Sequence, residues 1–395
     1  MFVYADNAAT TKMSPAAVAA MLPYLQEEYG NASSLYSFGQ KSAEALAGAR
    51  ETVARCINAQ PREIIFTSGG SEADNQAIRS AAAWGAVQGN KHIISTAFEH
   101  HAVLHTLNKL AKEGYEITLL NVHENGIVLP EQVAETIRED TCLVTVMYAN
   151  NEIGTIQPIS EIGAICRERG VWFHTDAVQA AGHLPIDVKA ENIDMLSMSG
   201  HKFHGPKGTG ALYVRRGAPL YSLIEGGAQE RSRRAGTENI AGICAMAAAL
   251  QEACAGMKES SARVTALRDR LIDGLSAIPH SILNGDRYAR LPGNVNFCFE
   301  GIEGESLLLL LDEAGICASS GSACTSGSLD PSHVLLAIGR PHEVAHGSLR
   351  LTLGEYNTEE EVDHILTEVP KVVEYLRGMS PVWKDLEAGR TEHLI

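Results

Sequence analysis

Short apolar runs alternate with amphipathic segments along residues 60–215. The runs are rich in β-branched residues, as strands are, and the segments at 72–87 and 101–114 have the apolar periodicity of helices. This alternation predicts an α/β architecture. The runs are EIIFTS (63–68), KHIIST (91–96), EITLLNV (116–122), CLVTVMYA (142–149), VWFHTDA (171–177), IDMLSMS (193–199) and GALYVR (210–215).

Several of these runs are almost continuously apolar. Strands of this kind are buried on both faces, which is typical of a largely parallel sheet that helices cover on both sides. Ligands bind such sheets at the carboxyl ends of the strands. We therefore expect a large, mostly parallel sheet with its binding site at that edge.

The pattern changes after residue 215, where a turn-rich stretch leads into a long helical region at 238–276. The polar residues KESS at 258–261 predict a break in this helix, and we place a domain boundary there. The large domain then covers residues 15–257.

The rest of the chain predicts a smaller α+β domain made of residues 1–14 and 258–395, which carries the loop around Cys324. We expect the N-terminal segment to pack against this domain. Its predicted strands are NVNFCFE and SLRLTLG, and its predicted helices are ESLLLLLDEAG and TEEEVDHILTEVPKVVEYLR.

The chain is acidic, because 48 acidic and 32 basic residues give a net charge of −16. No overall positive field attracts nucleic acid or an anionic membrane surface, so we expect neither as a partner. The longest aliphatic run, 307–311, is far shorter than the roughly 20 residues of a membrane span. Eight cysteines without a CxxC pair favour reduced thiols and a cytoplasmic protein.

Two strand ends carry candidate catalytic groups. Lys202 follows the run at 193–199 in a glycine-rich turn, where it is either a nucleophile that forms a Schiff base with an aldehyde cofactor or an exposed loop lysine. Asp176 ends the run at 171–177, where its carboxylate either holds a protonated ring nitrogen or caps the next helix.

Two further segments indicate a phosphate site and a reactive thiol. In FTSGGSEADN, Gly70 and Ser71 open a helix whose backbone N–H groups favour a phosphate, unless the turn only joins strand to helix. Cys324 lies in SSGSACTSGS, which is too polar for a core, so we expect an accessible nucleophilic thiol. The cysteines in apolar periodic segments are expected to be core residues: Cys56, Cys142, Cys166, Cys244 and Cys298.

A group of histidines and a basic segment each allow two interpretations. His201 and His204, with His174 and Asp176, could suggest a metal site, but no HExxH or cysteine cluster supports it, and we expect no metal. The arginines of the segment QERSRRAGTEN form either a solvated loop or an anion-facing interface loop, and we favour the interface.

These motifs, in this order, resemble those of the cysteine desulfurases of the NifS and IscS group, nearer the NifS type. These are pyridoxal 5'-phosphate (PLP) enzymes of the class V aminotransferase family and have fold type I. The motifs are DNAATT, GNASSLYSFG, FTSGGSEADN, EHHAVL, NNEIG, HTDAVQ, SGHKFHGPKG, RRAGTEN, EGES, SSGSACTSGSLDPSHVL and AHGSLRLTLG, and they span nearly the whole chain.

The resemblance implies a role for each matching residue. Lys202 would form the Schiff base with PLP, Asp176 would pair with the ring nitrogen, Gln179 with the ring hydroxyl oxygen, and His100 would stack on the ring. The phosphate-binding positions are Gly70, Ser71, Ser199 and His201, with Thr237 supplied to the neighbouring subunit of a homodimer. Asn151, which also lies among the cofactor contacts, and Arg350 would hold the substrate carboxylate.

The implied reaction converts L-cysteine to L-alanine and leaves the sulfur as a persulfide on Cys324. The implied use of that sulfur is iron–sulfur cluster assembly, with a cluster scaffold protein as acceptor. The alternatives are a selenocysteine lyase or another PLP reaction of the class V family, and a sulfur carrier that uses Cys324 without catalysis.

Overall fold

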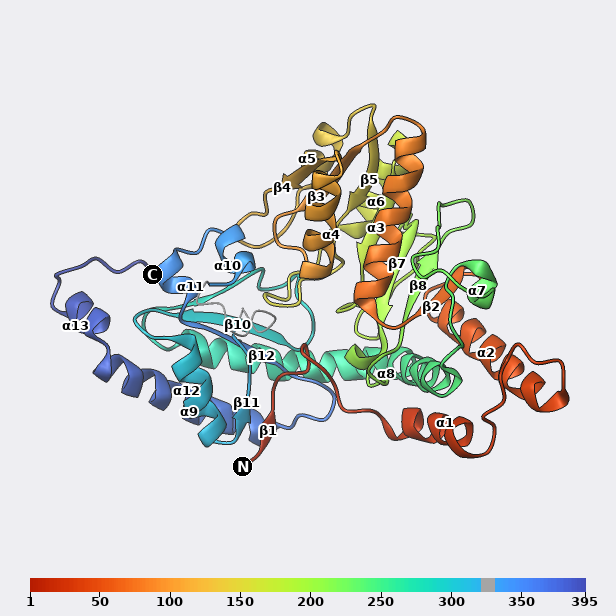
Figure 1. The fold of residues 1–395 in the computed structure, drawn as a ribbon. Coiled ribbons are helices and arrows are strands. Elements are labelled where there is room, and N and C mark those ends of the chain that lie inside the picture. The colour runs from red at the N-terminus through yellow and green to blue at the C-terminus, as the bar shows by residue number, and fades with distance from the viewer. Residues whose placement is uncertain (321–330) are drawn as a thin grey trace.

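Seven strands form the main sheet of the computed structural model, which describes residues 1–320 and 331–395 (Figure 1). Their spatial order is β2-β8-β7-β6-β5-β3-β4. Neighbouring strands run parallel except at β8, which is antiparallel to both β7 and β2. All seven predicted strands are confirmed: β2 (Ile64–Thr67), β3 (His92–Thr96), β4 (Glu116–Leu120), β5 (Thr141–Thr145), β6 (Trp172–Asp176), β7 (Met195–Ser199) and β8 (Gly210–Val214).

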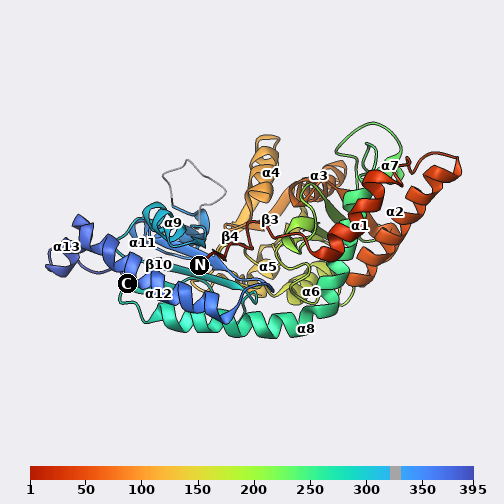
Figure 2. The same ribbon diagram turned by 90° about the horizontal axis from the view of Figure 1, so that it is seen from below.

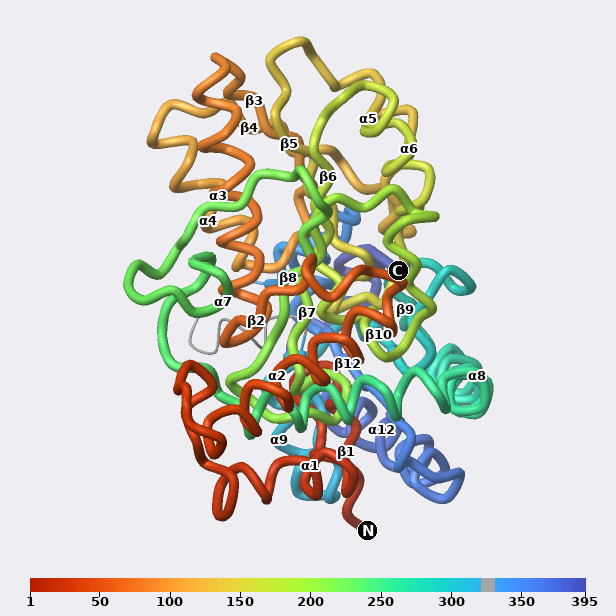
Figure 3. The backbone as a smooth tube through the Cα atoms, turned by 90° about the vertical axis from the view of Figure 1, so that its right-hand side faces the viewer, coloured from red at the N-terminus to blue at the C-terminus, as the bar shows by residue number. Residues whose placement is uncertain are grey.

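Helices cover both faces of this sheet, as the apolar strands predict. Figure 3 shows α3 (Gly70–Val87) and α4 (His101–Lys112) on one side, and α5 (Pro130–Thr136) and α6 (Ile159–Arg169) on the other. Successive strand residues alternate between the two layers. Ile65 packs with the residues of α3 and α4, whereas Ile64 and Phe66 pack in the opposite layer.

The other elements of this part surround the sheet and its loops. They are α1 (Pro15–Gln26), α2 (Ser37–Cys56), the 3₁₀ turns η1 (Pro61–Glu63) and η2 (Gly200–Lys202), and α7 (Gln229–Ser232).

A second, smaller sheet forms the core of the C-terminal part. It has three antiparallel strands in the order β12-β10-β9. The N-terminal strand β1 (Val3–Tyr4) pairs in parallel with β11 (Ile316–Cys317), which confirms that the N-terminal segment packs here. The remaining elements are β9 (Ser281–Leu283), β10 (Asn294–Phe299), β12 (Ser348–Thr352), α9 (Gly304–Glu313), α10 (His333–Ala337), α11 (His342–Ala345), α12 (Glu359–Met379) and α13 (Pro381–Glu387).

Helix α8 (Ile240–Ser276) joins the two parts and runs unbroken for 37 residues (Figure 2). The predicted break at 258–261 is therefore wrong. Those residues include neither glycine nor proline, so nothing in the backbone forces the helix to end there. Its first half packs into the core of the large sheet through Met246 and Leu250, and its second half into the core of the small sheet through Leu267 and Leu271.

By length and composition alone α8 could cross a membrane, but half of its most apolar window is buried inside the protein. Packing against two cores accounts for its apolar residues, as in the long core helices of globular proteins. The domain ranges 15–257 and 1–14 with 258–395 stay a prediction.

Candidate active site

The carboxyl ends of β2, β5, β6 and β7 meet at one edge of the large sheet. There the protein encloses a cavity of about 580 Å³, a size typical of small-molecule sites. The cavity brings together nearly all of the sequence-predicted site residues: His100, Gly70, Ser71, Asn151, Asp176, Gln179, Ser199, His201, Lys202 and Arg350.

Two predicted site residues are not part of this lining as the structure describes it. Thr237 is exposed and lies outside the cavity, so its role toward a neighbouring subunit stays a prediction. Cys324 lies within residues 321–330, outside the described part of the chain.

Lys202 presents its amine to the cavity from η2, directly after β7. Its Nζ donates to the carbonyl oxygens of Ala8, at 2.5 Å, and Ala9, at 2.9 Å. His183 Nε2 donates to the backbone oxygen of Lys202 at 2.9 Å and so holds the turn. The exposed-loop alternative is therefore wrong for Lys202, because its side chain lines the cavity and is held by the N-terminal segment.

Asp176 is a buried carboxylate at the end of β6. Its Oδ1 accepts the backbone N–H of Val178 at 2.9 Å, so the residue both stabilises the turn after the strand and lines the cavity. Burial raises the pKa of Asp176 to about 6, while that N–H and the charge of Lys202 act in the opposite direction. A carboxylate held in this way suits a protonated ring nitrogen.

The start of α3 forms a cradle whose shape requires glycine. A Cβ on Gly70 would lie 2.5 Å from Cγ2 of Val178, and a Cβ on Gly210 would lie 2.6 Å from the Cα of Gly69. The first helical turn is therefore packed closely against its neighbours, and Gly69, Gly70 and Ser71 line the cavity beside Ser199. A helix N-terminus with hydroxyl groups beside it suits a phosphate.

His100 and His201 stand in the cavity wall as neutral rings. His100 Nδ1 accepts the N–H of Ala102 at 3.1 Å, which leaves the proton of the neutral ring on Nε2. Burial, followed by the charge of Lys202, lowers the pKa of His100 to about 4. The same two causes, with Lys207 as a third, lower the pKa of His201 to about 4. Near pH 7 neither ring adds a full positive charge.

Arg350 reaches the cavity from β12 of the smaller sheet. Its Nη1 donates to the Asn151 backbone oxygen and its Nη2 to Asp6 Oδ1, both at 3.0 Å. Its Nε is buried and has no hydrogen-bond partner among the described residues. An arginine with a donor left over at a cavity wall suits a carboxylate.

The residues on either side of 321–330 are anchored beside this arginine. Ser319 and Arg350 exchange two backbone hydrogen bonds, at 3.1 and 2.6 Å. On the other side, Ser332 Oγ donates to Glu152 Oε2, and Glu152 directly follows Asn151. The described residues Ser319 and Ser332 are therefore held next to Arg350 and Asn151, which line the cavity.

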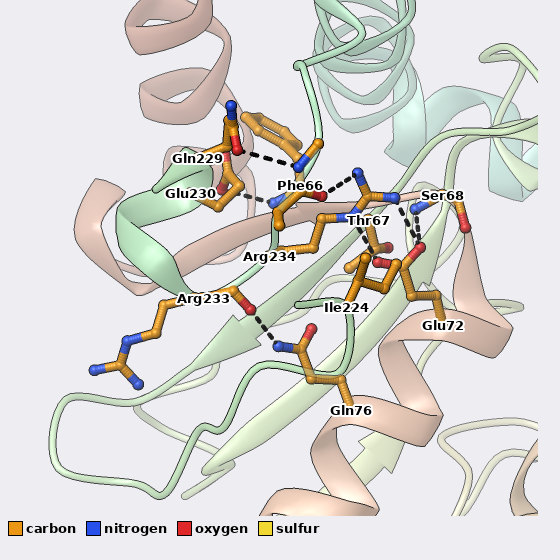
Figure 4. A network of polar contacts seen from close by, with 12 residues as sticks. Phe66, Thr67, Ser68, Glu72, Gln76, Ile224, Gln229, Glu230, Arg233 and Arg234 are labelled. Carbon is orange, nitrogen blue, oxygen red and sulfur yellow. Dashed lines mark hydrogen bonds and ion pairs between the residues drawn. The ribbon is translucent and has the colours of Figure 1, made fainter. Parts of the chain in front are cut away.

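A polar network ties the loop before α8 to β2 and α3 (Figure 4). Arg234 Nε donates to Glu72 Oε1 at 2.8 Å, and the N–H of Ser68 donates to Glu72 Oε2 at 2.9 Å. Gln76 Nε2 donates to the backbone oxygen of Arg233 at 2.8 Å. The first turn of α3, which forms the cradle, is thus fixed from both sides.

All three arginines of this loop donate hydrogen bonds within the chain. Arg231 donates to the oxygen of Ile64 at 2.8 Å, and Arg233 donates to the oxygen of Leu220 at 2.7 Å. Arg234 is bound to Glu72, as described above. These bonds order the loop, and its role at an interface stays a prediction.

The histidines considered for a metal site do not form one in the described residues. Both nitrogens of His174 are bonded to hydroxyls, of Thr145 at 2.8 Å and Ser197 at 3.0 Å. Within residues 1–320 and 331–395, the one group with ligand atoms close enough for an ion is His280, Glu300 and His393. Two of its rings stack at 3.7 Å, so their nitrogen lone pairs do not converge on one point.

The sequence reasoning missed several residues that the structure places in the cavity wall. Asp74 lies one turn after Gly70 on the same face of α3, and Val178 lies two residues after Asp176. The helical and strand periods already place both beside predicted site residues, so this signal was available. The others are Ala8, Ala9, Thr10, Ser68, Gly69, Glu72, Met147, Ala149, Lys207 and Gly208.

The donor set fits PLP. The lysine amine matches its aldehyde, the buried carboxylate its ring nitrogen, and the glycine-shaped helix start its phosphate. The donor left over on Arg350 fits the carboxylate of an amino-acid substrate.

Known proteins place the chain in a family. The model of the family "Aminotransferase class-V" matches residues 3–365. The chain is 55% identical to "Cysteine desulfurase IscS" of Clostridium botulinum over 393 residues, 99% of each chain. It is 56% identical to the protein of that name from Methanosarcina thermophila over 380 residues, 96% of this chain and 94% of that one.

A solved structure called "NIFS-LIKE PROTEIN" superposes with a TM-score of 0.90 at 36% identity, covering 95% of this chain and 100% of that one. The two-part α/β architecture is thus that of the fold-type-I PLP enzymes. The chain therefore belongs to the class V aminotransferase family, among its cysteine desulfurases.

Proposed function

We propose that the protein is a PLP-dependent cysteine desulfurase that converts L-cysteine to L-alanine and passes the sulfur to Cys324 as a persulfide. One observation carries the proposal. Lys202 from η2, Asp176 from β6 and Arg350 from β12 line the same cavity of about 580 Å³. This reaction needs three groups: an amine that binds the cofactor, an anion beside its ring nitrogen, and a guanidinium that binds the substrate carboxylate.

Each residue has a distinct task in binding. The first turn of α3 with Ser71, Ser199 and His201 holds the phosphate, Asp176 faces the ring nitrogen, and Gln179 the ring hydroxyl. Arg350 and Asn151 hold the substrate carboxylate, and His100 packs on the ring. When bound, PLP withdraws the electron pair that is released at the substrate Cα.

Lys202 moves the proton of the reaction. The carbonyl oxygens of Ala8 and Ala9 hold its Nζ at the cavity wall. With the substrate bound, the amine of Lys202 would remove the proton from the substrate Cα. Any variant without this amine loses both cofactor attachment and proton transfer.

Cys324 then takes the sulfur. Its thiolate attacks the substrate Sγ, an S–S bond forms, and the Cβ–Sγ bond breaks with its electron pair left on carbon. Protonation of that carbon gives the methyl group of alanine. Cys324 follows Ser319 by five residues, and a chain of that length reaches about 17 Å at most, so the pairing of Ser319 with Arg350 supports access to the cavity.

We infer that the functional unit is a homodimer, with Thr237 directed to the phosphate of the neighbouring subunit. Large apolar side chains on α1, on α2 and in the loop between them are exposed, which supports a partner on that face. They are Val18, Leu22, Leu25, Tyr29, Leu35, Tyr36 and Phe38.

The acceptor and the compartment follow from the family resemblance. We infer an iron–sulfur cluster scaffold protein as sulfur acceptor and a cytoplasmic location. Transamination has no use for a thiol such as Cys324, and the names of the relatives favour cysteine as substrate over selenocysteine.

The test combines a visible spectrum with product analysis. The purified protein with PLP is expected to show the absorbance of the lysine-bound cofactor, and L-cysteine with a thiol reductant to give alanine and sulfide in equal amounts. Lys202→Ala loses the band and turnover, by about 10³-fold or more. Lys207→Ala, which changes another cavity lysine, keeps the band.

Cys324→Ser separates the two halves of the proposal. It keeps the band and still binds cysteine, but it forms no persulfide. Sulfur transfer retained by Cys324→Ser would contradict the role of the thiol, whereas a band without sulfide in the wild type would point to another PLP reaction.

A further inference from the structure

Asp74 is a buried acid in the cavity wall to which the proposed function assigns no task. It projects from the first turns of α3, is 1% exposed, and lines the cavity beside Asp176. Its Oδ1 has no hydrogen-bond partner among the described residues. A carboxyl group in this position needs an explanation, because an unpaired buried charge is costly.

Asp74 faces a row of polar side chains that crosses three strands. Thr145 on β5 bonds to Nδ1 of His174 on β6, and His174 Nε2 bonds to Ser197 Oγ on β7. Ser197 is the register partner of Asp176, and its side chain lies within reach of Asp74. This row lies on the face of the sheet that α3 covers, and it ends beside Asp176.

Within residues 1–320 and 331–395, no cation is paired with Asp74. Its Oδ1 lies 3.6 Å from His174 Nε2, but burial lowers the pKa of His174 to about 3, so this ring is neutral and the contact is no ion pair. The charged and titratable groups that face Asp74 from other elements are Asp176 and His174 on β6 and Glu99 after β3. The positive charge of Lys202 acts on Asp176.

Asp74, Asp176 and Glu99 are thus three buried carboxyl groups that act on one another. Burial, with repulsion from Asp176 and Glu99, raises the pKa of Asp74 well above its ordinary value, while the interaction with Ser197 acts in the opposite direction. Burial also raises the pKa of Glu99 to about 8. Buried carboxylates that repel one another are not all ionised at once, and the proposed function requires Asp176, which faces the ring nitrogen, to be ionised.

We propose that Asp74 is a positioning residue that stays protonated and holds Ser197 and His174 in place, so that Asp176 is the anion beside the ring nitrogen. The inference rests on the proposed function in one respect, namely that the PLP ring nitrogen binds at Asp176. Asp74 itself touches neither substrate nor cofactor in this scheme. It acts through Ser197.

The first test is PLP binding by the cofactor-free, full-length protein near neutral pH. Asparagine copies the shape and polarity of a protonated aspartate, so Asp74→Asn is expected to keep the dissociation constant within about threefold of wild type. Asp74→Leu offers no polar group to Ser197, and we expect about tenfold weaker binding or more. Weak PLP binding by Asp74→Asn would show that a charge at residue 74 is needed. Tight PLP binding by Asp74→Leu would show that Asp74 positions nothing. Either result overturns the proposal.

The second test uses pH and reads protonation directly. A native Asp74 that holds its proton, against an ordinary pKa of about 3.9 in the unfolded chain, makes the wild type lose stability relative to Asp74→Asn as pH rises. In urea, the equilibrium constant of unfolding then grows with pH in the wild type. Relative to the constant of Asp74→Asn, it grows by up to about tenfold per pH unit above pH 5. A constant ratio, or an Asp74→Asn that does not fold, overturns the proposal.

Two controls keep the outcomes separate. Asp312→Asn, which removes the carboxylate of an exposed aspartate on α9, is measured beside Asp74→Asn as the control. A wild type that binds no PLP would contradict the proposed function, while the urea experiment would still decide whether Asp74 carries its proton.

Discussion

Glu230 accepts two hydrogen bonds from Arg50, at 2.6 and 2.7 Å, and a third from the N–H of Phe66 at 3.0 Å. β2 is an edge strand of the large sheet, so Phe66 has no neighbouring strand on that side. Arg50 also donates to the oxygen of Ile64 at 2.8 Å. The ion pair thus provides hydrogen-bond partners for the Phe66 N–H and the Ile64 oxygen at the open edge of the sheet.

Breaking this pair is expected to destabilise the protein strongly. The side chain of Arg50 is 13% exposed and that of Glu230 is 3% exposed, so either single variant leaves a largely buried charge without its partner. Arg50→Ala and Glu230→Gln should each lower the free energy of unfolding by about 3 kcal/mol or more. Urea unfolding of the full chain measures this.

The double variant Arg50→Ala, Glu230→Gln is the control for direct coupling. Since the two residues stabilise each other, the double variant should cost clearly less than the sum of the single ones. Additive costs would mean that the pair does not act as a unit.

Backbone strain near this pair can be relieved by glycine. Glu230, Arg231 and Ser232 all have positive φ, of 47°, 59° and 61°, a conformation that costs a residue with a Cβ about 1 kcal/mol. Ser232 is exposed, so Ser232→Gly should raise the free energy of unfolding by up to about 1 kcal/mol.

A serine in a regular helix should respond in the opposite way. Ser261 lies inside α8, and Ser261→Gly is expected to lower the stability by about 0.5 kcal/mol. If Ser232→Gly were as destabilising as Ser261→Gly, the positive φ at Ser232 would not be a source of strain.

The strands of the large sheet were predictable because they are short, apolar and separated by clear helical periods. The break at 258–261 was predicted wrongly, because a polar patch on a long helix resembles a loop when the partners of the helix are unknown. Here α8 is stabilised by two cores that come from distant parts of the chain, and no local pattern contains that information.

Lys202, Asp176 and the cradle at Gly70 were predictable in the same way, since parallel strands end at the same edge of a sheet. The interaction of Ala8 with Lys202 was not, because it joins segments 194 residues apart. The pairing of Ser319 with Arg350 depends in the same way on tertiary contacts. Such pairs carry no local signal in a single sequence.

The ionisation of Asp176 predicts a pH dependence of cofactor binding. Burial raises its pKa to about 6, so in the cofactor-free protein Asp176 is largely protonated at pH 5 and ionised at pH 7. PLP affinity should therefore rise with pH through this range, by up to about tenfold per unit below pH 6. Asp176→Asn should bind PLP about tenfold more weakly or worse at pH 7 and lack this rise.

Stability of the cofactor-free protein should change in the opposite direction. A folded-state pKa raised above the ordinary value of about 3.9 gives stability that is fully present below pH 4 and is lost as pH rises through 6. Titration of PLP and urea unfolding, each from pH 4.5 to 7.5, measure the two effects. The same affinity profile in wild type and Asp176→Asn would exclude Asp176 as the titrating group.

Recognition of the substrate carboxylate should depend on Arg350. Its Nη atoms are held by Asn151 and Asp6, which orients the fork toward the cavity before any substrate binds. Arg350→Ala removes charged hydrogen bonds worth about 1.5–3 kcal/mol, so kcat/KM for L-cysteine should fall by about 10- to 100-fold, mainly through KM. Arg350→Lys keeps the charge but not the two parallel N–H donors. Its kcat/KM for L-cysteine should lie between the values for wild type and Arg350→Ala.

Cysteamine is the matched control, because it carries the amine and the thiol of cysteine without the carboxylate. Its binding to the PLP-loaded protein, followed by the shift of the visible band, should be equally strong in wild type and Arg350→Ala. The lower kcat/KM of Arg350→Ala for L-cysteine would then be due to the lost contact with the substrate carboxylate alone. An equal loss for both compounds would mean that Arg350 acts by supporting β12 and the pairing with Ser319, and that another group binds the carboxylate.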